Sequence, residues 1–234
     1  MKGIFFLDER SSADLGLHIS SGGILNCPEV DTEPISIPGK SGDLILSNRR
    51  FKNTPVQYKA FTDARALQCI SELKTWLLQK SGYRRLQDNF DPTFFRMARF
   101  VGPLNIESYV LKAAEFTIVF DCKPQRYLCD GETIVTMSVA GEIYNPTAFP
   151  AAPVIRVYGT SAGTLMVGNT VVQIKSINEY VDLDCELQDA FKGITNCNGN
   201  VYAPNFPELP PGITGISFSG GITKIEIKPR WWQV

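Results

Sequence analysis

The chain has 234 residues, of which 44% are hydrophobic, and its 23 basic and 24 acidic residues give a net charge of −1. That length permits one large domain or two smaller ones, and the apolar content is enough for a folded core. The balanced charge excludes a general electrostatic attraction to nucleic acid or anionic membranes. No apolar run reaches the roughly 18–20 residues that cross a bilayer.

The opening segment, MKGIFFLDERSS, has too short an apolar run for a signal peptide, which predicts synthesis and folding in a cytoplasm. In that compartment the cysteines are expected to be reduced thiols: Cys27, Cys69, Cys122, Cys129, Cys185 and Cys197. No Cys-x2-Cys pair occurs, and the single histidine, His18, is remote in sequence from Cys122 and Cys129. No metal site is therefore predicted.

The first elements in chain order are extended. Residues 14–20, DLGLHIS, alternate apolar and polar side chains, which predicts a half-buried strand with His18 on its polar face. In residues 28–46, Pro28, Pro34 and Pro38 bar a helix and disfavour a central strand. These residues are expected to form short extended pieces around a Pro-Gly turn, as an arm or a hairpin. Residues 56–61 alternate again and predict a strand.

The pattern then changes to a helical period. Between residues 62 and 82 the apolar side chains recur at helical spacing, which predicts one amphipathic helix over about 63–81 whose apolar stripe belongs to the core. Thr62 or Asp63 is expected to cap its first amides, and Gly82 to end it in a left-handed conformation. The stripe consists of Ala66, Cys69, Ile70, Leu73, Trp76 and Leu77.

The remainder of the chain is rich in short β runs. Residues 94–101 and 113–122 predict strands, the second ended by Pro124. After a proline-rich boundary, further short runs are separated by Gly and Asn turn signals, which favours an antiparallel sandwich or barrel. These runs include VIRVYG, which ends at Gly159, and TLMVGN, GITGISFSG and ITKIEIKPRW. The prediction is a mainly β chain with one amphipathic helix: an N-terminal β domain over 1–136 and a C-terminal antiparallel β-sandwich over 137–234.

The segment IPGKSGDL, residues 37–44, contains the Gly-Lys-Ser of nucleotide-binding P-loops. That motif needs a glycine five residues before Gly39 and a helix after Ser41. Position 34 is instead Pro34, and the following GDLILSN is strand-like. The segment is therefore interpreted as a turn, with Asp43 hydrogen-bonding to nearby amides.

Three acids in YVDLDCEL, residues 180–187, are the next candidate. Alternation puts Asp182, Asp184 and Glu186 on one strand face, where they suggest a calcium site or the acid and base of a glycosidase. A straight strand cannot curl around an ion, and glycosidase carboxylates normally come from different strands. We interpret the three acids as a solvated strand face.

Other chemistry has weak support. Nucleophilic catalysis would depend on the single histidine, and no Gly-x-Ser-x-Gly elbow occurs. The basic clusters at 48–52 and 83–85 are too short for a nucleic-acid footprint. Trp231 and Trp232 have three open interpretations: stacking on sugar rings, contact with a partner subunit, or closure of the core. With no catalytic, cofactor or metal site predicted, the chain is expected to work through surfaces rather than as an enzyme.

Several segments, in order, resemble the distal tail proteins, often called Dit, of phages that infect Gram-positive bacteria. These segments are SIPGKSGDLIL, NRRFKNTPVQY, WLLQKSGYRRL with DNFDPTFFRMARF, FTIVFDCKPQRYL, NPTAFPAAPVIRVYG, VDLDCELQDAFK and FPELPPGITGISFSG. Together they cover most of the chain.

The resemblance implies a structural virion protein and no enzymatic activity. It implies a hexameric ring at the tail tip, built by N-terminal domains with an extended arm (about residues 28–50) and carrying galectin-like C-terminal domains. Implied partners are other copies of the chain, the tail tube protein, and a tail-associated lysin or fibre and receptor-binding proteins. DNA only passes through the ring, and no membrane is involved. The alternative function is a carbohydrate-binding module that engages host cell-wall glycans.

Overall fold

The computed structural model describes residues 2–21, 27–62, 66–110 and 113–234. The chain divides into two compact units, residues 1–126 together with Val234, and residues 127–233. The sequence pattern places the boundary after residue 136. The difference arises because β11 (Val135–Met137) pairs with β19 (Gly212–Lys228), and the Leu128 amide donates to the Trp231 carbonyl at 2.9 Å.

The first unit is an antiparallel sheet whose strands run in the order β2-β1-β7-β8-β10-β6-β3, with β9 added to β10. Backbone hydrogen bonds of 3.1 and 2.9 Å between Gly3 and Ile19 join the start of the chain to β3. The strands are β1 (Phe5–Leu7), β2 (Arg10–Ser11), β3 (Leu17–Ile19), β6 (Thr54–Thr62), β7 (Arg84–Asp88), β8 (Phe94–Phe100), β9 (Ile106–Val110) and β10 (Ala113–Leu128).

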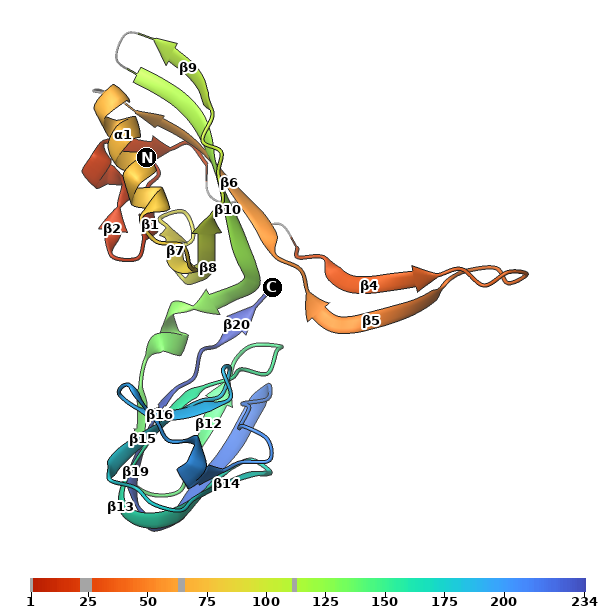
Figure 1. Cartoon of the computed structure of the whole chain (residues 1–234), viewed down its shortest axis with the longest axis vertical. Helices are drawn as coiled ribbons and strands as arrows, with labels where there is room; N and C mark the ends of the chain where they lie inside the picture. The colour runs from red at the N-terminus through yellow and green to blue at the C-terminus, as the bar shows by residue number, and fades with distance from the viewer. Residues whose placement is uncertain (1, 22–26, 63–65, 111–112) are drawn as a thin grey trace. The chain divides into compact units, whose positions relative to one another are not determined.

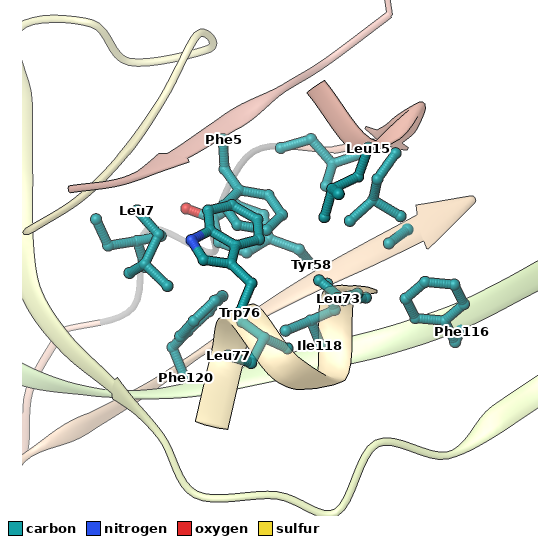
Figure 2. Close-up of a cluster of buried hydrophobic side chains, with 14 of the residues drawn as sticks. Phe5, Leu7, Leu15, Tyr58, Leu73, Trp76, Leu77, Phe116, Ile118 and Phe120 are labelled. Carbon is teal, nitrogen blue, oxygen red and sulfur yellow. The ribbon is translucent and has the colours of Figure 1, made fainter. Parts of the chain in front are cut away.

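Helix α1 (Ala66–Leu78) packs its predicted apolar stripe into this unit's core. The ring of Phe5 stacks on Trp76 of the helix and on Tyr58 of β6, with both pairs of ring centroids 5.6 Å apart (Figure 2). Phe120 of β10 meets Phe5 edge-on at 5.8 Å. Such aromatic packing secures the helix on the sheet, and the prediction of a core stripe is confirmed for its described side chains.

The ends of the helix differ from the prediction. The helix ends at Leu78, and Gly82 does not have a left-handed backbone. Thr62 lies in β6, where its hydroxyl accepts the Ala114 amide at 3.0 Å, and Asp63 is outside the described residues.

The predicted strand over 14–20 is also shorter than expected. Ser12–Leu15 form a 3₁₀ turn capped by Ser11, and Gly16 ends it at φ 66° before β3 begins. Ser11 and Asp14 satisfy each other's amides in a capping box, which stabilises the turn over the extended form. Leu15, Leu17 and Ile19 are nonetheless all buried.

Strand β10 continues to Leu128, although the sequence pattern predicts that the strand ends at Pro124. Its pairing with β6 stops at Cys122 opposite Thr54, so the amide hydrogen that Pro124 lacks is not needed for that ladder.

The second unit is an antiparallel sheet in the order β11-β19-β13-β15-β16-β17, with β12 on β19, and β14 on both β13 and β18. The strands not yet introduced are β12 (Gly141–Asn145), β13 (Val154–Val167), β14 (Thr170–Ile174), β15 (Glu179–Asp184), β16 (Asp189–Lys192), β17 (Thr195–Asn196), β18 (Val201–Tyr202) and β20 (Trp232–Gln233).

The long pair β13–β19 joins runs that the sequence pattern separates. Gly159 looks like a turn signal, but it is a point of close approach between the strands. A Cβ there would lie 2.5 Å from the Gly221 carbonyl oxygen, so only glycine lets the strands bulge past each other. Apart from the strand lengths, the predicted mainly β fold with one α-helix and antiparallel sheets is confirmed for the described residues.

Candidate functional site

Strands β4 (Val30–Ile35) and β5 (Leu44–Phe51) pair only with each other and form a separate two-stranded ribbon (Figure 1). We call residues 28–51 the arm. Its tip is the former P-loop candidate. The Lys40 amide donates to the Ile37 carbonyl at 3.1 Å, and Gly39 between them has φ 80°. Pro38 followed by a glycine at positive φ is the signature of a type II turn.

The turn interpretation of IPGKSGDL is therefore confirmed in its backbone. Asp43, expected to anchor the turn, is exposed, and the closing bond is the backbone contact from Lys40. Gly42 also has a positive φ, of 88°.

The glycines at the arm tip give a first testable prediction. No atom lies within 4 Å of a Cβ built on Gly39 or Gly42, so valine would clash with nothing and would act only through the backbone. A left-handed β-branched residue costs about 1–2 kcal/mol per position. The variant with Gly39→Val and Gly42→Val is expected to need about tenfold more protein to self-associate in light scattering. Asparagine at both positions, which tolerates this conformation, should behave like the wild type.

The arm is apolar without being buried. Opposite residues of an antiparallel pair share a face, so the pairs Glu33–Leu46 and Ile35–Leu44 lie on one side. We call these four residues the leucine face. Ile35, Leu44 and Leu46 are 41%, 51% and 46% exposed. A lone two-stranded ribbon is marginally stable in water, and exposed apolar residues at this density mark a contact surface.

Ion pairs hold the base of the arm. Arg50 Nε donates to Asp31 at 2.6 Å, and Lys52 Nζ donates to Glu29 at 2.9 Å. The Arg50 hydrogen bond lowers the pKa of Asp31 below its usual value. The third acid of this strand region, Glu33, is exposed and has no cation partner in the described part of the chain. Two residues of the basic cluster at 48–52, Arg50 and Lys52, thus form ion pairs with acids of the arm.

The first unit also contains an open cleft with a volume of about 510 Å³, within the range of ligand pockets. We call it the aromatic cleft. Its apolar walls are Val56, Tyr58, Leu86, Phe90, Phe94 and Phe95, and its polar lining comes from Gln87, Asp88, Asp91, Arg96 and Arg126.

The two arginines of the cleft differ in their pairing. Arg126 is bonded to Asp91, and its guanidinium carbon lies 4.3 Å from the centroid of the Phe94 ring. Arg96 is half-buried and, across the described ranges, makes no hydrogen bond or ion pair. Burial lowers the pKa of Arg96, yet a guanidinium keeps its charge in proteins. The cleft therefore combines two arginines with two acids, Asp88 and Asp91, between aromatic walls.

The three acids of residues 180–187 are not a solvated face, and this interpretation is wrong for two of them. Asp182 and Asp184 are 4% and 6% exposed. Arg156 donates to Asp182 at 2.6 and 2.9 Å, and Arg230 donates to Asp184 at 2.9 Å through each nitrogen. Alternation from Asp182 would put Leu187 on the face opposite the acids, but Leu187 is 71% exposed because β15 ends at Asp184.

These two-bond ion pairs also argue against a calcium site and against a glycosidase acid and base at these residues. An arginine that occupies both oxygens of a carboxylate leaves little for calcium, and the lowered pKa of Asp184 makes that acid a poor proton donor. No group of three or more His, Cys, Asp or Glu residues in the described ranges is placed to hold a metal ion.

Asp184 makes the stability of the second unit depend on pH. Burial alone would raise the pKa of Asp184. The hydrogen bonds and charge of Arg230, together with hydrogen bonds from the Leu187 and Glu186 amides, outweigh burial and leave the pKa below 3.8. The depressed pKa stabilises the fold above the unfolded value of about 3.9, and this contribution is lost as the pH falls through the folded value. Thermal denaturation should show a constant midpoint from pH 8 to about pH 5 and a fall below about pH 4.

The tryptophans near the end of the chain take part in packing. Trp231 is 6% exposed in the second core. Trp232 stacks on Phe149 with centroids 4.5 Å apart, and its ring nitrogen donates to the Pro150 carbonyl at 2.9 Å. Of the three interpretations, closure of the core holds for Trp231.

The remaining candidates are structural. His18 is half-buried beside Phe61 at 5.7 Å. Arg84 of the 83–85 cluster is 8% exposed, pairs with Asp8 at 2.9 Å and donates to the Trp76 carbonyl. None of the six cysteines is in a disulfide, and burial raises the pKa of Cys122 and Cys185 to about 12, which keeps both protonated at neutral pH.

No family model and no curated protein matches the chain. No helix within the described ranges is long and apolar enough to span a bilayer. Its fold, however, is that of a phage distal tail protein. One solved structure that it resembles is the SPP1 Dit protein (gp 19.1), described as a paradigm of hub adsorption apparatus in phages infecting Gram-positive bacteria. The TM-score is 0.75 at 11% identity, and the match covers 100% of both chains.

Proposed function

We propose that the protein is a structural subunit of the hub at the distal end of a phage tail. Six copies form a ring that joins the tail tube protein to a tail-associated lysin, fibre or receptor-binding proteins, and DNA passes through the bore. The first unit builds the ring, and the second is a galectin-like domain carried by it. The protein acts through its surfaces and not as an enzyme.

The observation that carries this proposal is the arm. A fold match at 11% identity shows architecture alone. The arm adds a physical requirement for a partner, because its exposed aliphatic side chains cover nothing within the described chain. Assembly into a ring supplies a neighbouring surface for every copy.

The alternative of a carbohydrate-binding module loses the residues on which it rested. A sugar stacks on an exposed aromatic face, whereas Trp231 is buried and one face of the half-buried Trp232 ring is stacked on Phe149.

Location in the virion tests the proposal. Antibodies against the second unit, conjugated to gold and imaged on intact phage particles by electron microscopy, are expected to label the end of the tail away from the head. Labelling along the tube or on the head, or binding only to infected-cell lysate and never to particles, would contradict a tail-tip hub.

A further inference from the structure

We propose that the second unit binds a neutral saccharide in a pocket at the start of β19. This pocket has a volume of about 610 Å³, which lies within the range of ligand pockets. We call it the polar pocket. The inference goes beyond the proposed function, because a ligand site within the second unit does not depend on ring formation. It also uses neither Trp231 nor Trp232.

The polar pocket gathers side chains that have no partner within the chain. Its polar lining comes from the turn between β13 and β14, the turn between β15 and β16, and the loop that leads to β19. Within the described chain, none of these lining side chains makes a hydrogen bond or an ion pair: Asn169, Thr170, Gln188, Asn205 and Glu208. By contrast, Asn145 of the same unit donates to the Phe149 and Leu209 carbonyls at 2.9 and 2.8 Å. Unpaired polar groups that converge on one cavity are available to a ligand.

One buried hydroxyl of the lining is also unsatisfied. Thr214 is 3% exposed, and its Oγ1 has no hydrogen-bond partner in the described chain. The backbone beside it is already closed, because the Gly168 amide donates to the Gly215 carbonyl at 2.8 Å. A buried hydroxyl without a partner is destabilising, so a ligand hydroxyl that enters the pocket would gain by supplying the missing bond.

The charge of the lining selects the class of ligand. Glu208 is the one charged residue among the lining residues, and no lysine or arginine is among them. A phosphate or carboxylate would therefore meet an acid and no cation. Neutral hydroxyls fit, because each can donate to an amide or carboxylate oxygen and accept from an amide nitrogen. A sugar ring presents several such hydroxyls on adjacent carbons.

An exposed aromatic ring lies beside the polar pocket. Ile213 lines the pocket and is 67% exposed, and its direct partner on β12 is Tyr144, which is 64% exposed. Opposite residues of an antiparallel pair share a face, so the two side chains are neighbours. A sugar ring has an apolar C–H face that packs on such a surface while its hydroxyls meet the polar groups. Tyr144 thus offers the exposed aromatic face that the buried Trp231 lacks.

A side chain placed in the polar pocket tests the assignment. A Cβ built on Gly215 meets no atom within 4 Å, and the φ of Gly215 is not positive, so Gly215→Leu preserves the fold while it fills space in the pocket. Gly199→Leu is the matched control, because Gly199 is an exposed glycine of the same unit with the same open surroundings and lies outside the pocket.

Saturation-transfer NMR on the full chain measures binding of four probes, namely glucose, galactose, N-acetylglucosamine and N-acetylgalactosamine. At least one probe is expected to bind with a Kd on the order of millimolar, as befits a single sugar ring. Gly215→Leu should raise that Kd by about tenfold or more, and Gly199→Leu should leave it within about twofold.

Two further variants test the polar and aromatic contacts separately. Asn205→Ala removes an exposed amide and should raise the Kd by about three- to tenfold. Tyr144→Ala removes the aromatic face and should raise it by a similar factor. Circular dichroism checks that each variant is folded.

Three results would overturn the proposal. These are binding of none of the four sugars, binding that Gly215→Leu leaves unchanged, and saturation transfer to tri-alanine or glucuronate in preference to the neutral sugars, which would mark a peptide or anion site. Light scattering on the same samples keeps the proposed function separate. Gly215→Leu should assemble like the wild type, and a wild type that binds sugar but never assembles would contradict only the proposed function.

Discussion

A variant with Leu44→Asp and Leu46→Asp is expected to remain monomeric at concentrations where the wild type assembles. The two side chains are 51% and 46% exposed in the single chain, so burying the exposed half of each against a neighbour is worth about 1.5–3 kcal/mol together. Their loss alone weakens association by about ten- to a hundredfold, and burying two carboxylates costs more. Sedimentation velocity measures the result directly.

The stability of the monomer should not change in this variant, because exposed positions rarely alter unfolding free energy by more than about 0.5 kcal/mol. The control is Val139→Asp with Ile194→Asp, which adds two aspartates at apolar positions of the second unit that are more exposed than Leu44 and Leu46. The control should assemble normally. Assembly of the Leu44 and Leu46 variant at the wild-type concentration would show that the leucine face is not a subunit contact.

Replacing Arg230 with methionine is expected to lower the free energy of unfolding by about 3 kcal/mol at pH 7. Methionine preserves most of the apolar stem but removes both hydrogen bonds to Asp184, whose carboxylate is then buried without its cation. The measurement is chemical denaturation followed by tryptophan fluorescence.

The pH dependence of unfolding tells whether Arg230 stabilises the fold through its charge. Without Arg230, burial dominates and the pKa of Asp184 rises above its unfolded value, so protonation on acidification should favour the folded form. The stability difference between variant and wild type should therefore narrow below about pH 4. A constant difference across this range would mean that Arg230 acts through packing and not through its charge. Lys224→Met, which removes a cation with an ordinary surface pairing to Glu226, is the control and should cost less than about 1 kcal/mol.

Local sequence patterns predicted much of the fold because they report local physics. The helical period from Cys69 to Leu77 placed the correct face in the core, and the spacing of Pro28, Pro34 and Pro38 predicted the extended arm. The missing glycine at position 34 argued against a P-loop, and strand β5 follows Ser41 in place of the helix that a P-loop needs. Each of these inferences depends on residues a few positions apart.

The predictions that were wrong depended on contacts between residues distant in the sequence, which local patterns do not report. Asp182 and Asp184 alternate like a solvated face, and only Arg156 and Arg230, distant in sequence, make their burial possible. Gly159 looked like a break because its close partner, Gly221, lies on another strand. The aromatic cleft draws its lining from residues 56–126, and no motif connects them.

The mass of the assembled wild-type protein tests the central claim most directly. Light scattering coupled to size exclusion, over a range of concentrations and with the tail tube protein added where needed, should show a species with the mass of six 25.9 kDa chains. The species should disappear in the Leu44→Asp and Leu46→Asp variant. A wild-type chain that stays at 25.9 kDa at every concentration and with its tail partner present would contradict the account.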